Sequence, residues 1–146
     1  MKLSDFECDP RKTVDGVWVD YVTGELVPNP ALDQAGGPLL LRCARFNNPA
    51  FQSAIVKSGT KRQNKRGEAD VDLIDSTVIK AACKHLFKGW SCLEGDDGKY
   101  VSFTSKKCYE IVSDPRYRDL YEDWIQLCRN REYFEAKDEE SNRKNS

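Results

Sequence analysis

Residues 81–112, AACKHLFKGWSCLEGDDGKYVSFTSKKCYEIV, constrain the fold more than any other stretch, because a glycine and an acidic turn divide them into short elements. Apolar or small side chains recur every three or four positions over residues 71–86, which predicts a helix of about four turns beginning near Asp70. Gly89 is predicted to end this helix, since glycine adopts the left-handed conformation at little cost.

A tight turn and a strand are predicted to follow. The Asp97-Gly98 pair predicts the turn, and the alternating residues 99–103 predict a half-buried strand. The acids here do not form a calcium loop, because no glutamate follows at the distance that such a loop requires. Thr104 or Ser105 is predicted to cap a second, short helix.

Two earlier segments, residues 15–24 and 39–46, are predicted to be strands that pair antiparallel, with a proline-containing loop between them. Asn48 is predicted to cap a helix that begins at the next residue, a proline. A final helix with an apolar stripe is predicted from Pro115 onward. Trp90, as a large apolar side chain, is predicted to lie in the core.

These elements predict an α+β fold that is dominated by helices. We expect a small antiparallel sheet of two or three short strands with about four helices. Residues 1–135 are predicted to form a single domain. Residues 136–146 are polar, without apolar periodicity, and are predicted to be a flexible, disordered charged tail.

The charge, hydropathy and cysteine placement of the chain disfavour several classes of function. The net charge of −1 does not favour nucleic-acid binding by bulk electrostatics. No apolar run of about 18 residues is present, so we expect no membrane span, and the first residues lack the apolar segment of a signal peptide. We therefore expect a cytoplasmic protein. The six cysteines are scattered without a C-x-x-C pair, and we expect them to be reduced, mostly buried and free of zinc.

The sequence contains no recognisable catalytic motif. A cysteine nucleophile needs a histidine base, and His85 is the single histidine, on a predicted helix face. No nucleophile elbow, P-loop or dinucleotide fingerprint is present. We therefore expect no enzyme activity, no catalytic residue, no cofactor and no metal.

Two segments are candidates for binding a partner. Tyr133 and Phe134 follow the last predicted helix where the surroundings become charged, and an exposed aromatic pair there would suit a protein partner. The segment 57–66 carries five positive charges and no acid, which would suit phosphate contacts. Its cationic residues are Lys57, Lys61, Arg62, Lys65 and Arg66. No aromatic residue lies among them to stack on bases, so a solvated surface is the preferred interpretation.

The order of several motifs resembles that of the tail assembly chaperones of long-tailed, siphovirus-like bacteriophages. These motifs are GVWVD at 16–20, LLLRCARFNNPAF at 39–51, LFKGWSCL at 86–93, the Asp-Gly turn with YVSFT at 100–104, and a closing helix before a charged tail. The likeness extends from about Gly16 to Asn145.

The resemblance implies a non-enzymatic factor in the host cytoplasm. Proteins of this kind bind the tape measure protein and tail tube subunits during tail morphogenesis. A homo-oligomer of this chain stays open as well. Such proteins supply no catalytic residues, and neither membrane nor nucleic acid is expected as a partner. Two alternatives stay open: a nucleic-acid-binding regulatory protein that uses the basic segment 57–66, and a small inhibitor of a host protein.

Overall fold

The computed structural model describes residues 1–57, 61–63 and 69–136. Its centre is a three-stranded antiparallel sheet in the order β1 (Val17–Asp20), β2 (Leu40–Cys43) and β5 (Phe87–Ser91). The predicted pairing of the two early strands is confirmed, with Val19 opposite Leu41. β2 pairs on its other side with β5, with Leu41 opposite Trp90.

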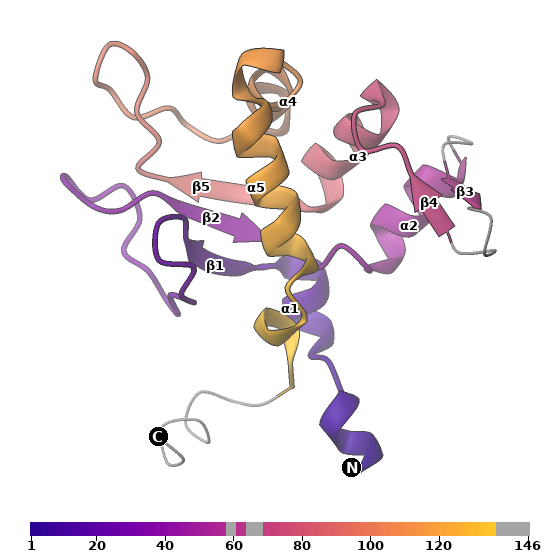
Figure 1. Cartoon of the computed structure of the whole chain (residues 1–146). Helices are drawn as coiled ribbons and strands as arrows, with labels where there is room; N and C mark the ends of the chain where they lie inside the picture. Colours follow the sequence, from indigo (N-terminus) through magenta and orange to yellow (C-terminus); the bar gives the residue numbers. More distant parts are fainter. Residues whose placement is uncertain (58–60, 64–68, 137–146) are drawn as a thin grey trace.

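Five α-helices and two further strands surround this sheet within the described residues. They are α1 (Pro10–Asp15), α2 (Pro49–Lys57), β3 (Lys61–Gln63), β4 (Ala69–Val71), α3 (Ser76–His85), α4 (Ser105–Val112) and α5 (Arg118–Arg129). Short 3-10 turns span Leu3–Phe6, Pro115–Tyr117 and Arg131–Phe134. The predicted α+β class with a small antiparallel sheet is confirmed. Figure 1 shows α5 crossing one face of the sheet, with β3 and β4 paired beside α2 at the periphery.

The core lies between the sheet and the helices α2 to α5, and several of its large aromatic side chains meet between α5 and β5. Trp124 of α5 is fully buried and stacks on Phe87 of β5, with ring centroids 4.2 Å apart. Trp90 is 5% exposed, as predicted for a core residue, and its indole N–H donates to the carbonyl of Val101 at 2.6 Å. α5 and β5 contribute several of the large buried aromatic side chains, so aromatic packing holds this helix against the sheet.

The prediction that Gly89 ends a helix is wrong. α3 ends at His85, and Gly89 lies inside strand β5 opposite Arg42. A Cβ atom at Gly89 would come within 3.2 Å of the Trp18 ring, so glycine serves close packing here. The segment becomes a strand because β2 otherwise has an unpaired edge of backbone donors and acceptors beside the core.

Three further boundaries differ from the sequence predictions. The helix predicted from Asp70 begins instead at Ser76, capped by Asp75, because residues 69–71 form β4. The strand predicted at 99–103 is absent, and only the isolated bridge between Glu94 and Tyr100 pairs there. The helix predicted from Pro115 starts with a 3-10 turn, and α5 itself begins at Arg118.

Several local predictions are confirmed. Asn48 accepts a hydrogen bond from the Phe51 N–H at the start of α2, and Thr104 accepts one from the Lys107 N–H at the start of α4. Gly98 has a positive φ in the turn and donates to the carbonyl of Gly95. The predicted tail over 136–146 lies outside the described residues except for Ala136. No helix in the described part of the chain is long and apolar enough to cross a membrane.

Candidate partner-binding groove

The aromatic pair predicted to be exposed is buried. Phe134 is 0% exposed and Tyr133 is 9% exposed. The chain turns back after α5, and its last 3-10 turn packs against α1, where the Asp9 N–H donates to the Phe134 carbonyl at 2.8 Å. The prediction of an exposed pair is therefore wrong. The charged neighbours suggested exposure, but the return of the chain to the N-terminal segment buries both rings.

The basic segment 57–66 is described only in part. Lys57 is exposed at the end of α2, and the backbone of Lys61 and Arg62 lies in β3. Lys65 and Arg66 lie outside the described residues. The use of this segment in nucleic-acid binding stays a prediction.

A different surface emerges between α3 and α4. These two helices pack side by side and enclose an open, mostly apolar groove of about 460 Å³. Lys80, Cys83 and Lys84 line it from α3, and the lining from α4 is contributed by Ser105, Lys106 and Tyr109. A concave apolar surface of this size is large enough to accept side chains of a partner.

Both helices that form the walls of the groove are capped at their N-terminal ends. α3 starts with Asp75, whose carboxylate accepts from the Thr77 N–H at 2.8 Å, and α4 starts with the Thr104 cap. Between the walls, the Cys83 and Cys108 thiols are joined by a hydrogen bond, which together with burial raises the pKa of Cys108 far above its usual value. Such walls need little ordering when a partner binds, which favours affinity.

The rim of the groove is positively charged. Lys80, Lys84 and Lys106 are all exposed, and within the described ranges none of the three pairs with a carboxylate. The one ion pair of α4 joins its neighbour Lys107 to Glu110 at 3.7 Å, outside the groove. Lys106 also lies in the first turn of α4, which contains no acid although the helix dipole favours negative charge there.

A second groove has the opposite charge. It measures about 310 Å³ and runs along α5 beside the segment before α3. Ile74, which is 62% exposed, forms part of its apolar lining, while Glu122 and Asp123 contribute carboxylates. Asp123 accepts a hydrogen bond from the Tyr21 hydroxyl at 2.5 Å, and this bond is the main cause of the raised pKa of Tyr21.

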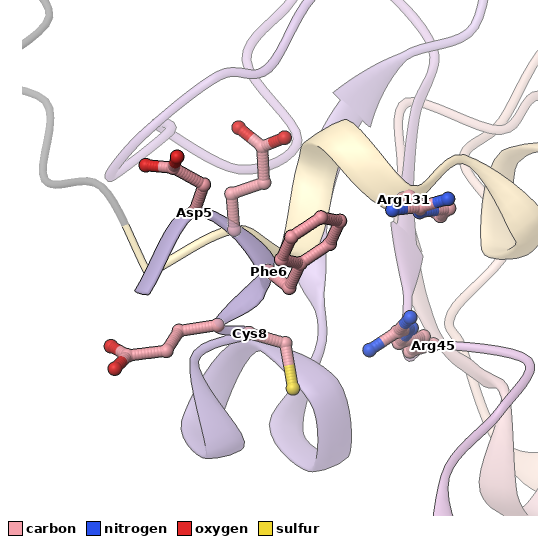
Figure 2. Close-up of a pocket in the computed structure, with 7 residues that line it drawn as sticks. Asp5, Phe6, Cys8, Arg45 and Arg131 are labelled. Atoms are coloured by element: carbon pink, nitrogen blue, oxygen red, sulfur yellow. The ribbon is translucent and has the colours of Figure 1, made fainter. Parts of the chain in front are cut away.

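A third depression lies against the N-terminal segment and is much smaller. Figure 2 shows Phe6 and Cys8 on the side of this segment that faces Arg45 and Arg131, with Asp5 turned away. The cavity has a volume of about 40 Å³. That volume suits a few water molecules rather than a substrate.

The described residues contain no group of three or more histidine, cysteine or acidic side chains placed to hold a metal ion. All six cysteines are free thiols, as predicted, and four of them are buried: Cys43, Cys83, Cys108 and Cys128. Burial, with Lys88 and Lys84 nearby, lowers the pKa of His85. The expectation that the protein is not an enzyme stays a prediction.

The sequence offered only a partial signal for the α3–α4 groove. Lys80 and Lys84 stand four residues apart and so project from one helix face, which usually indicates an ordinary solvated surface. Lys106 and Tyr109 lie on a different predicted helix. Nothing in the sequence indicated that the two helix faces converge, because their contact joins elements that are separated in the sequence by β5 and the turn after it.

Comparison with known proteins gives one finding. Residues 46–145 match the family described as YdaY prophage protein, and this region includes α2 to α5, both walls of the groove and most of the core. No curated protein and no solved structure matches the chain. Because the match covers more than half of the 146 residues, the chain belongs to the family of YdaY prophage proteins.

Proposed function

We propose that this prophage protein is a tail assembly chaperone, which binds the tape measure protein and tail tube subunits during tail morphogenesis without catalysing a reaction. The observation that carries the proposal is an open apolar groove with a charged rim in a protein of phage origin. A chaperone of this kind must cover apolar helices reversibly, and it needs a binding surface rather than a closed active-site cleft.

Two further observations support the proposal. The order of motifs along the chain resembles that of tail assembly chaperones, and the family match is to prophage proteins. The groove lies on capped helices rather than on loops, so it is formed before a partner arrives. The site of action in this proposal is the cytoplasm of the host cell.

The test is affinity purification of the tagged protein from a lysogen during prophage induction, with mass spectrometry and absorbance at 260 nm. Retention of tape measure or tail tube protein without nucleic acid is expected. A matched strain that lacks the tape measure gene controls for unspecific retention. Nucleic acid that elutes with salt, without any tail protein, would contradict the proposal and favour the basic segment 57–66 as the functional region.

A further inference from the structure

We infer that the groove between α3 and α4 binds an amphipathic helix with an acidic face, and that this helix belongs to the tape measure protein. The identity of the partner rests on the proposed function. The chemistry of the docking helix rests on the groove itself. Its apolar side chains would lie over Cys83 and Tyr109, and its carboxylates would face the ammonium groups of Lys80, Lys84 and Lys106.

The geometry of the groove fits a helix. Lys80 and Lys84 are four residues apart on α3, and Lys106 and Tyr109 are three residues apart on α4, so each wall presents one line of side chains. A docked helix presents apolar side chains along one stripe and carboxylates at its edges with the same periodicity. The volume of about 460 Å³ accommodates more than one large side chain.

The charge of the groove selects an acidic occupant. Three exposed lysines surround the apolar floor, and in the described part of the chain no carboxylate neutralises them. The whole chain has a net charge of −1, so this local excess of positive charge is not a general property of the surface. Acidic side chains at the rim would steer association and fix the register of the docked helix.

Two other occupants fit the groove less well. Nucleic acid would meet a mostly apolar floor, and the lining contains no arginine for bidentate phosphate contacts. The chain's own residues 137–146 include three acids but no apolar side chain, so they cannot fill the floor. A separate helix with both an apolar stripe and carboxylates matches both the apolar floor and the positively charged rim of the groove.

The test uses the full chain coexpressed with the tape measure protein of the same prophage. The groove variant combines Lys80→Glu, Lys84→Glu and Lys106→Glu. The control variant combines Lys2→Glu, Lys99→Glu and Lys107→Glu, three exposed lysines outside the groove, and it has the same net charge. We expect the groove variant to lose binding by about tenfold or more and the control variant to retain it.

A second readout locates the contact directly. A zero-length carbodiimide joins a lysine to a carboxylate only where the two meet, so cross-links from Lys80, Lys84 or Lys106 to acids of a tape measure helix are expected. Equal binding by the groove variant and the unaltered protein would overturn the groove as the docking site while leaving the chaperone proposal standing. If the unaltered protein does not retain the tape measure protein, both the proposed function and this partner are wrong. Nucleic acid retained by the unaltered protein and lost from the groove variant would also overturn the inference.

Discussion

The hydroxyl of Tyr133 donates a hydrogen bond to the backbone carbonyl of Gly24, 109 residues earlier in the chain. The adjacent Phe134 is fully buried, and its carbonyl accepts from the N–H of Asp9. These contacts join the last described turn to the loop after β1 and to the start of α1. The segment that the charge pattern made a candidate for partner binding is therefore part of the core.

Substitution of the two aromatic residues tests this structural role. Phe134→Ala is expected to lower the free energy of unfolding by about 3–5 kcal/mol, because it removes a fully buried ring. Tyr133→Phe retains the ring and removes only the hydrogen bond to Gly24, which is expected to cost about 1 kcal/mol. Urea unfolding followed by tryptophan fluorescence measures both. Changes within about 0.5 kcal/mol for both variants would indicate an exposed pair instead.

The thiols are expected to differ widely in reactivity. Cys8 is exposed and Cys92 is partly exposed, whereas Cys43, Cys83, Cys108 and Cys128 are buried. A colorimetric disulfide reagent should modify Cys8 fastest in the native protein, Cys92 more slowly and the buried four only after denaturation, because a buried thiol is inaccessible to the reagent. Fast reaction of all six cysteines without denaturant would show that the core is not closed as described.

Stability is expected to fall at alkaline pH. The pKa of Cys108 is raised mainly by its hydrogen bond to Cys83 and also by burial. The pKa of Cys128 is raised mainly by burial and also by its hydrogen bond to Cys43. The native state then holds protons that the unfolded state releases above about pH 8.5, so this contribution to stability is complete below that pH and declines above it. Each thiol contributes a slope of up to about 1.4 kcal/mol for each pH unit.

Unfolding experiments between pH 7 and pH 10.5 measure this slope. Cys108→Ala is expected to be less stable at pH 7 but to have a shallower decline at alkaline pH, because one of the two thiols is gone. Cys8→Ser is the matched control, since the Cys8 side chain is exposed and should leave the slope unchanged. A slope that is the same in Cys108→Ala and the unaltered protein would rule out this thiol as the cause.

Local chemistry predicted much of the fold. The alternation around Val17 and Val19 and the caps at Asn48 and Thr104 depend on neighbours within a few residues, and each led to the correct element. Residues 86–91 were misassigned because Leu86 continues the helical stripe and Gly89 is a common helix terminator. Their strand conformation is decided by pairing with β2, which lies more than forty residues earlier.

The groove depended even more on tertiary structure. Its walls are two helices separated by β5 in the sequence that contact each other directly, and no local pattern encodes that contact. The lysines of the two walls each have the sequence signature of a solvated helix surface. The burial of Tyr133 and Phe134 was missed for the same reason, since it requires the chain to return to α1 after α5.

Lys106 provides a test in which stability and function change in opposite directions. It stands in the first turn of α4, close to Lys80 and Lys84 across the groove, where both the helix dipole and the neighbouring cations disfavour a positive charge. Lys106→Glu is therefore expected to stabilise the protein by about 0.5–1 kcal/mol and raise the Tm by a few degrees, at about 2–4 °C for each kcal/mol.

The same substitution is expected to weaken retention of the tape measure protein, because it places a carboxylate where the groove would meet an acidic helix. Thermal unfolding and coexpression binding measured on one preparation give both values. Lys107→Glu is the control, since Lys107 occupies the same turn of α4 outside the groove and Glu at its position completes a capping box with Thr104. It should leave binding unchanged, and its gain in stability should be smaller than that of Lys106→Glu, because it also removes the ion pair between Lys107 and Glu110. A stabilised Lys106→Glu protein that binds as tightly as the unaltered one would show that this lysine is not part of the docking surface.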